Sequence, residues 1–128
     1  MKLSADYIAG FFDGEGCVSF NRLRQVQAGR EYFILRVTIA QKHRRILDIL
    51  QRQLKIGTVS QIRRENQYNH RWIVQRLAAA QFLRLIQGRV VIKHKQVEAA
   101  LKAFDSGLPA SKLSRAYWQL RRLKRQPH

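Results

Sequence analysis

The sequence predicts an α+β fold of one domain, with elements in the order α-β-β-α-β-β-α and further helices after them. Three observations support this prediction. Residues 17–40 and 58–75 each contain two segments in which apolar and polar residues alternate, as in strands. Apolar residues at helical spacing precede, separate and follow these pairs. A length of 128 residues, of which 45% are hydrophobic, suits a single domain (residues 1–128) with its own core.

A short and mostly buried helix is predicted at the N-terminus. Ser4 is a suitable N-cap, and Asp6 in the first turn favours the positive end of a helix. We expect Gly14 and Gly16 to end this helix. Its apolar positions are Tyr7, Ile8, Phe11 and Phe12.

The first predicted hairpin covers residues 17–40. The strand over residues 17–27 places Val18, Phe20 and Val26 on one side, but Leu23 falls on the polar side. Either a bulge near Leu23 or a strand that extends beyond the core would explain this exception. Residues 28–31 are the predicted turn. The second strand, over residues 32–40, has its apolar face at Phe33, Leu35, Val37 and Ile39.

The rest of the chain repeats this pattern and adds helices. A helix that ends before Gly57 has its apolar stripe at Ile46, Ile49, Leu50 and Leu54. A second hairpin follows, with strands over residues 58–64 and 68–75 and a tip at 65–67. Helices are then predicted over residues 78–87, along the stripe of Val97, Ala100, Leu101 and Phe104, and over residues 111–125 with Ser111 as cap.

The formal net charge of +17 predicts a polyanionic partner. Basic residues are spread along the whole chain, which favours nucleic acid over a membrane surface. No acidic residue follows Asp105, so the last helix either contacts a phosphate backbone or presents a solvated charged face. There is no apolar run of membrane-spanning length and no signal peptide, so we expect an intracellular protein with no membrane partner.

Cys17 is the only cysteine, so it cannot form a disulfide within the chain. The four histidines have no spacing relative to it that would suit a zinc site. We interpret Cys17 as a small, buried strand residue.

One face of the predicted strands carries the side chains that hydrogen-bond to base edges, rather than the Lys and Glu of an ordinary surface. We therefore predict that this face binds DNA. Its residues are Ser19, Asn21, Gln25, Gln27, Tyr32, Ile34, Arg36, Thr38, Thr58, Ser60, Arg64 and Arg71.

Two acids, Asp13 and Glu15, stand at the predicted end of the first helix. The negative end of the helix dipole disfavours carboxylates there unless a cation or a cap compensates them. A hard divalent ion such as Mg²⁺ would stabilise them. A simple acidic turn that caps the helix is the alternative.

The segment Ile8-Ala9-Gly10-Phe11-Phe12-Asp13-Gly14-Glu15-Gly16 resembles the motif of the LAGLIDADG homing endonucleases. Two further segments resemble the same family: Ala40-Gln41-Lys42 at the end of the second strand, and Ile92-Lys93-His94-Lys95-Gln96 before a late helix. The resemblance covers about residues 4–105. It implies the homing-endonuclease fold, in which a curved antiparallel sheet is the DNA-binding saddle.

The single motif resembles that of the homodimeric members. The resemblance implies that Ala9 and Gly10 let two motif helices approach closely, and that Asp13 is structural. It implies that Glu15, with the Gly14 carbonyl, binds Mg²⁺, for which Mn²⁺ is expected to substitute. The other implied catalytic residues are Gln41, which would position a water, and Lys93, which would offset transition-state charge, with Arg44 or Arg45 as candidate partners.

The implied function is that of an intron-encoded endonuclease. It would break both strands of a long pseudo-palindromic DNA site and leave 3′ overhangs. A bacterial cytoplasm and an organelle are both compatible with it. The first alternative is a non-cleaving member of the same fold, such as an intron maturase or a regulator that binds DNA or RNA. A basic ribosomal or chromatin-like protein would explain the charge but not the acids at residues 13 and 15.

Overall fold

A computed structural model describes residues 1–25, 29–65 and 67–125, with the backbone alone at positions 25, 64, 67 and 68. Its elements have the predicted order, which confirms the α+β fold. They are α1 (Ala5–Glu15), β1 (Gly16–Gln25), β2 (Arg30–Gln41), α2 (Arg44–Leu54), β3 (Thr58–Arg64), β4 (Gln67–Gln75), α3 (Arg76–Ile86) and α4 (His94–Asp105). A 3-10 turn, η1 (Ala110–Lys112), leads into the last helix, α5 (Ser114–Arg125).

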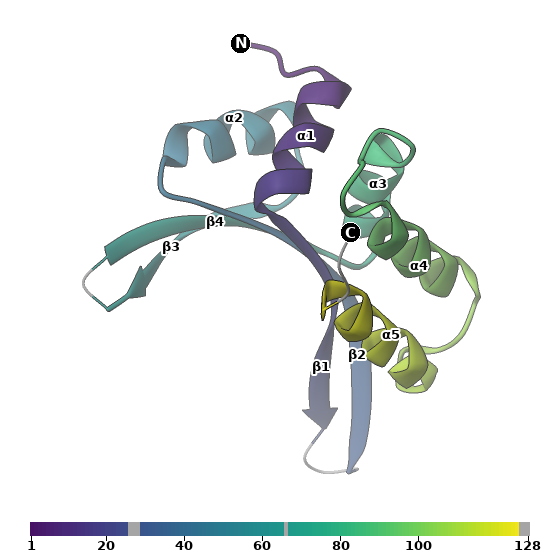
Figure 1. Ribbon diagram of the computed structural model, residues 1–128. Helices are drawn as coiled ribbons and strands as arrows, with labels where there is room; N and C mark the ends of the chain where they lie inside the picture. The colour runs from purple at the N-terminus through teal and green to yellow at the C-terminus, as the bar shows by residue number, and fades with distance from the viewer. Residues whose placement is uncertain (26–28, 66, 126–128) are drawn as a thin grey trace.

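The four strands form one antiparallel sheet in the order β1-β2-β4-β3, so the two hairpins join through β2 and β4. Figure 1 shows that the sheet bends, with β3 and β4 in one arm and β1 and β2 in the other. Helices α1 to α4 lie on the outer side of the bend (Figure 1). The inner side of the sheet is therefore a concave face that the helices leave uncovered.

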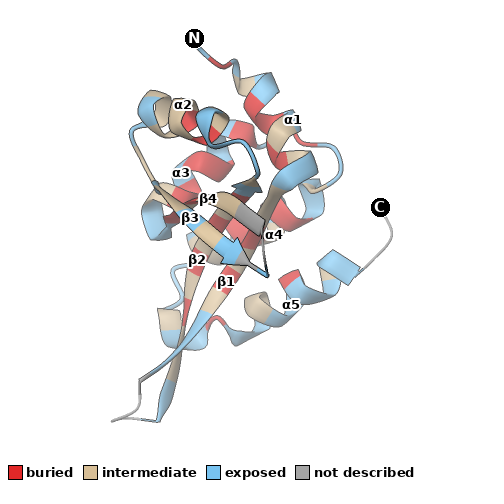
Figure 2. Ribbon diagram, turned by 90° about the vertical axis from the view of Figure 1, so that its left-hand side faces the viewer, coloured by how far each residue is buried: buried red, intermediate tan, exposed pale blue. Residues whose placement is uncertain are grey.

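The face of the sheet beneath the helices supplies much of the core. Its buried strand residues are Val18, Phe20, Phe33, Leu35, Val37, Ile39, Trp72 and Val74. These residues alternate with partly exposed ones along the strands, as the colours of Figure 2 show. The alternation predicted for residues 32–40 is thus confirmed, and that of the first strand is confirmed over residues 17–21. Residues 22–24 are all exposed, and Val26 lies outside the described residues.

The structure corrects the turn, excludes one of the two explanations for Leu23, and contradicts the burial predicted for Cys17. Gly29 lies in the turn as predicted, but Arg30 and Glu31 are strand residues that pair with Gln25 and Arg24, and residue 28 lies outside the described residues. The β1–β2 register runs without interruption from Gly16 to Gln25, so there is no bulge. Cys17 is only partly buried, because its neighbour Val18 points into the core and successive side chains point to opposite faces.

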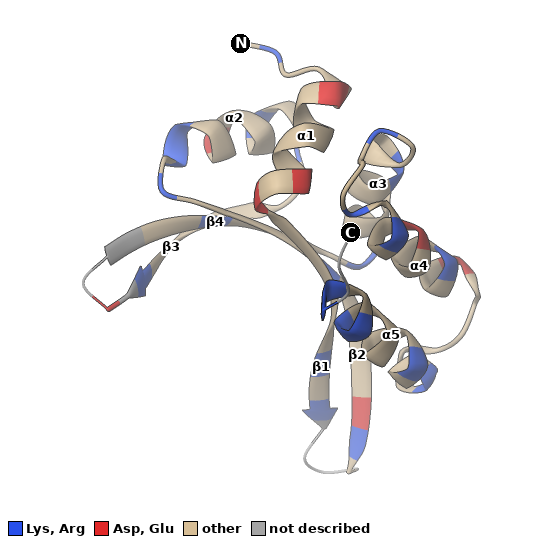
Figure 3. Ribbon diagram, viewed as in Figure 1, with Lys and Arg blue, Asp and Glu red and all other residues tan. Residues whose placement is uncertain are grey.

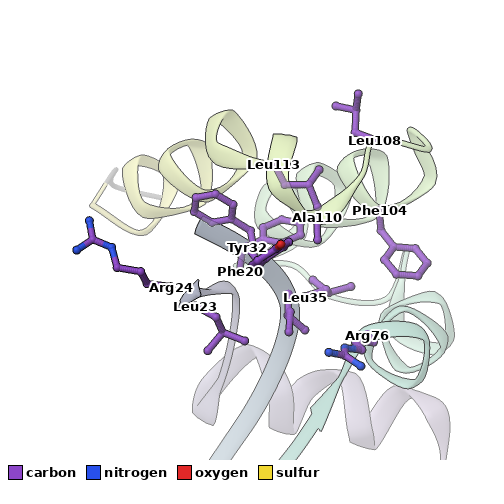
Figure 4. Close-up of a pocket in the computed structure, with 12 residues that line it drawn as sticks. Phe20, Leu23, Arg24, Tyr32, Leu35, Arg76, Phe104, Leu108, Ala110 and Leu113 are labelled. Atoms are coloured by element: carbon purple, nitrogen blue, oxygen red, sulfur yellow. The ribbon is translucent and has the colours of Figure 1, made fainter. Parts of the chain in front are cut away.

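The alternative explanation for Leu23 holds. Arg22 and Arg24, which have the same parity as the buried Val18 and Phe20, are exposed, so this end of β1 extends beyond the core. Leu23 pairs with Tyr32 on the opposite, uncovered face and is 43% exposed. A cavity of about 710 Å³ lies beside this end of the hairpin (Figure 4). Its lining is mainly apolar and includes Phe104 of α4, and Leu108 and Leu113 from the segment between α4 and α5.

The helix ends partly match their predictions. The Ser4 side chain accepts a hydrogen bond from the Tyr7 N–H at 3.0 Å, which confirms it as the N-cap of α1. Gly14 does not end α1, which continues to Glu15 and is capped by Gly16. Ser111 does not cap α5, because residues 110–112 form η1 and α5 begins at Ser114.

Candidate functional site

The C-terminal end of α1 lies over the middle of the sheet. The helix leads directly into β1, whose first residue, Gly16, pairs with Ile39 of the central strand β2. A Cβ atom at Gly16 would lie 2.2 Å from the Phe12 ring, so only glycine allows this close turn. The turn delivers Glu15 to the bend between the two arms of the sheet.

Glu15 is exposed and makes no hydrogen bond or ion pair with any described residue. The last turn of α1 contains no basic residue, and its final carbonyl groups have no partners within the helix. The Glu15 carboxylate and the neighbouring Gly14 carbonyl therefore form a group of oxygen atoms at the negative end of a helix. This charge arrangement is unfavourable unless a cation joins it.

Asp13 is held in a different way. Its carboxylate accepts hydrogen bonds from the backbone N–H groups of Val91 (2.6 Å), Ile92 (3.2 Å) and Lys93 (3.0 Å). These groups lead into the N-terminus of α4, where partial positive charge favours an anion. Asp13 thus joins α1 to α4, in agreement with the structural role expected for it.

The Lys93 ammonium group reaches the same helix end. Its Nζ donates to the carbonyl of Asp13 at 2.5 Å and to that of Phe12 at 3.3 Å. It also lies 5.9 Å from the centre of the Phe12 ring. Lys93 is therefore the cation that offsets the end of α1, close to the two predicted acids although it is separated from them by about 80 residues.

Gln41 is the last residue of β2, two positions beyond the Ile39 that pairs with Gly16. It therefore lies at the edge of the sheet beside the end of α1. Its Oε1 accepts a hydrogen bond from the Lys42 N–H at 2.8 Å. His70 pairs with Gln41 across the β2–β4 ladder, and its Nδ1 lies 3.2 Å from the Lys42 carbonyl oxygen.

The two arginines suggested as active-site partners make other contacts. Arg44 forms an ion pair with Asp48, one turn further along α2, at 3.4 Å. Arg45 lines a surface hollow together with Met1 and Lys2, which precede α1. Arg45 therefore neighbours the start of α1, whereas Glu15 is at its end.

The residues predicted to bind DNA share the concave face wherever the structure describes them. The β1–β2 pairs include Ser19 with Arg36, and the β3–β4 pairs include Ser60 with Arg71. We call this surface the open face. Its described positions, none of which is acidic, are 17, 19, 21 and 23 of β1, 30, 32, 34, 36, 38 and 40 of β2, 58, 60 and 62 of β3, and 69, 71, 73 and 75 of β4. Gln25 and Arg64 lie in the strands, and Gln27 falls outside the described residues.

Two arginines lie close together at the centre of the open face. Burial, and after it the positive charge of Arg71, lower the pKa of Arg36, while Cys17 raises it. The Nε of Arg71 is buried without a hydrogen-bond partner. Buried guanidinium nitrogens normally have acceptors, so this pair is suited to an electronegative group from outside the chain.

The outer side of α1 departs from the prediction for its small residues. Ala9 is fully buried in the chain's own core, so it cannot meet a second helix. Gly10 and Gly14, four residues apart on the opposite side, are exposed, and a Cβ atom at either would meet nothing within 4 Å. The exposed Tyr7 and the partly exposed Phe11 flank these two glycines.

Comparison with known proteins places this geometry in a family. The LAGLIDADG-like domain profile matches residues 2–87. The chain belongs to the LAGLIDADG family. No curated protein sequence matches it.

Several solved homing endonucleases share the fold of this LAGLIDADG chain. The archaeal intron-encoded I-Vdi141I, complexed with DNA, superposes with a TM-score of 0.78 at 18% identity, over 97% of this chain and 86% of that one. I-CvuI, bound to the I-CreI target in 2 mM Mg with the DNA not cleaved, gives 0.77 at 19% identity over 96% and 83%. I-TnaI gives 0.74 at 19% identity over 98% and 96%.

Some residues of the LAGLIDADG site were not singled out from the sequence. Asn69 and Gln75 share the open face with Arg71, and the period of two along β4 could have identified them. His70 carries no comparable signal, because only the pairing of β4 with β2 brings it to Gln41.

The described residues contain no further site of two kinds. No three His, Cys, Asp or Glu side chains are grouped as metal ligands. Nor does any described helix have the length and apolar character of a membrane span.

Proposed function

We propose that this LAGLIDADG chain is a homodimeric, metal-dependent endonuclease that breaks both strands of a long pseudo-palindromic DNA site and leaves 3′ overhangs. One observation carries the proposal. Glu15 is an exposed carboxylate without a described partner, at the point where α1 leads into β1, and the concave face of the same sheet has no acid among its described side chains.

The donor atoms at this point fit Mg²⁺. The Glu15 carboxylate and the Gly14 carbonyl are hard oxygen ligands, which Mg²⁺ prefers, and Mn²⁺ should replace it. One chain provides only this small set, so DNA phosphates and a second copy of the chain would complete the coordination. When bound, the metal would polarise the phosphoryl oxygens and supply a water nucleophile.

Other residues of the chain would prepare the site. Asp13 fixes the segment that carries Lys93, because its carboxylate accepts the backbone N–H groups of residues 91–93. Lys93 would stabilise charge that develops on the phosphate, since its ammonium already lies at the end of α1. Gln41 would orient water through its side-chain amide.

The glycines of α1 support a dimer through this helix. Each glycine inside a helix destabilises it by about 1 kcal/mol relative to alanine, and no described residue occupies the space beside Gly10 or Gly14. Their presence is explained if a second helix backbone approaches this surface. A two-fold axis there would bring two Glu15 side chains to the two DNA strands.

The size of the sheet sets the length of the target. Strand β2 has 12 residues, which span about 40 Å, and B-DNA rises about 3.4 Å per base pair. One subunit can therefore follow about 12 base pairs of groove, and a dimer about twice that number in two related half-sites. The Gln, Asn, Arg, Ser and Thr side chains of the open face would hydrogen-bond to base edges there.

The second candidate is a non-cleaving LAGLIDADG protein that binds DNA or RNA, as a maturase or a regulator would. The same open face and charge favour it. The presence of Glu15, Gln41 and Lys93 together favours cleavage instead, because binding alone requires no unpaired acid beside the phosphates.

The test is a cleavage selection. The purified chain is incubated with a randomised, pseudo-palindromic duplex library in Mg²⁺ and, separately, in Ca²⁺, and the ends produced are sequenced. We expect paired cuts with 3′ overhangs at a two-fold site in Mg²⁺, and their loss in Glu15→Gln with DNA binding retained. Glu98→Gln is the matched control, since it removes an exposed acid from α4 that contacts only Gln87 among described residues. Binding without cuts in every metal tested would refute cleavage and favour the second candidate.

A further inference from the structure

Helix α5 has a strongly basic outer side that the proposed site does not use. Leu120 faces the core, while the opposite arc of the helix is exposed over its full length of 12 residues, about 18 Å. We call this arc the outer face of α5; it consists of Arg115, Trp118, Arg121, Arg122 and Arg125. The basic residues of α5 are blue in Figure 3.

The charge on this face is not compensated within the described chain. Arg115, Arg122 and Arg125 make no ion pair or hydrogen bond with a described residue. No acid follows Asp105 in the sequence. Like charges one turn apart destabilise a helix, so this arrangement is unfavourable unless an anion neutralises it.

Aromatic side chains fix two guanidinium groups beside this face. Arg22 of β1 lies 5.2 Å from the Tyr117 ring centre and 5.9 Å from that of Trp118. Arg121 lies 5.6 and 5.8 Å from the same two rings. The Tyr117 ring in turn packs against Phe33, 5.3 Å away between centres. The two arginines are thus preorganised on packed rings at the edge of the sheet.

The basic surface continues from α5 to the open face. A hollow of about 380 Å³ along the edge of β1 is lined by Ser19 and Asn21 of the open face and by Arg121 and Lys124 of α5. The Lys124 ammonium also lies 3.1 Å from the sulfur of Cys17, another residue of the open face. A ligand on the open face that passes the edge of β1 therefore meets α5 next.

We infer that the outer face of α5, together with Arg22, binds the sugar–phosphate backbone of the same DNA duplex that occupies the open face. This inference rests on the proposed function for the identity of the ligand. Guanidinium groups match phosphate oxygens in a two-point geometry, and contacts of this kind carry no sequence information. A membrane-surface helix would need several large apolar side chains on its exposed side, whereas this face has only Trp118.

The test measures binding of the full chain to a random-sequence duplex over a range of salt concentrations, by fluorescence anisotropy. Each phosphate contact contributes about 0.9 to the slope of log affinity against log salt. We expect Arg115→Gln/Arg122→Gln to reduce that slope by about 2 and to weaken binding to random and selected duplexes by the same factor. Arg52→Gln/Lys102→Gln is the matched control, because it removes two charges from exposed positions of α2 and α4 and should leave the slope nearly unchanged.

The outcomes separate this inference from the proposed function. A slope equal to that of the wild type or of the control, with binding intact, overturns the role of α5 alone. A loss confined to the selected target would mean base recognition and also overturns it. The inference is also overturned if the α5 variant binds DNA normally but no longer binds phosphatidylserine vesicles, because that result would assign the face to a membrane. If the wild-type chain binds no duplex DNA, the proposed function itself fails.

Discussion

Gly10→Ala should make the single chain more stable and its dimer weaker. Gly10 lies within α1 on an exposed side, and a Cβ atom there meets nothing within 4 Å. Replacing a helical glycine with alanine stabilises a helix by about 1 kcal/mol. For a domain of 128 residues, this gain raises the melting temperature by about 4 °C.

The dimer should respond in the opposite direction. If two α1 helices approach at Gly10, the substitution places two methyl groups in the contact, one from each chain. Overpacking of this kind costs about 1–3 kcal/mol per site. A total near 2 kcal/mol would raise the dissociation constant of the dimer about 30-fold.

Both effects can be measured on one preparation. Sedimentation velocity over a range of concentrations gives the dimer affinity, and thermal unfolding at the most dilute concentration gives the stability of the monomer. Gln81→Ala on the exposed side of α3 is the control, since it should change neither quantity appreciably. A variant that melts higher and still dimerises and cuts DNA like the wild type would refute the role given to Gly10.

Two further substitutions test the framework of the site. Asp13→Ala should destabilise the fold by about 1–3 kcal/mol in urea unfolding, because three backbone N–H groups lose their acceptor, and unchanged stability would contradict this account. Gly57→Ala should cost about 2–4 kcal/mol, because φ is +85° and the new Cβ would lie 2.3 Å from Trp72 Nε1. Gly88 also has a positive φ, of +80°, but a Cβ atom there meets nothing within 4 Å. Gly88→Ala should therefore cost only the backbone strain, about 1 kcal/mol. Equal losses of stability at the two glycines would refute the contribution of the clash with Trp72.

The local spacing of apolar residues predicted most of the elements, because strands and helices each require apolar residues at a characteristic interval along the sequence. The period of two in residues 32–40 placed four side chains in the core, and all four are buried. The order of strands in the sheet has no such local signal. The neighbours β2 and β4 are joined by pairs that run from Gln41 with His70 to Arg36 with Gln75, far apart in the chain, so no short window of sequence contains that information.

The candidate site divides in the same way. A helix end with two acids was visible in the sequence, but their different environments were not, since Asp13 is distinguished only by the backbone of residues 91–93. Ala9 was misassigned because small size suits both a core and a helix contact, and only the direction of the side chain separates them. Cys17 was misassigned because cysteine side chains are usually buried in proteins. Its neighbour Val18 points into the core, and the alternation along a strand therefore places Cys17 on the opposite face.

The end of α1 explains why a chain of such high positive charge keeps two acids together. The Asp13 carboxylate is stabilised by the N-terminus of α4, and the carbonyl groups of Phe12 and Asp13 are stabilised by Lys93. The helix end is therefore held in place by groups that leave Glu15 unpaired among the described residues. A carboxylate whose only role was to cap or to pair would have been given one of these partners. The selective neutralisation of its neighbours, with Glu15 left free, is the arrangement expected of an acid whose partner comes from outside the chain.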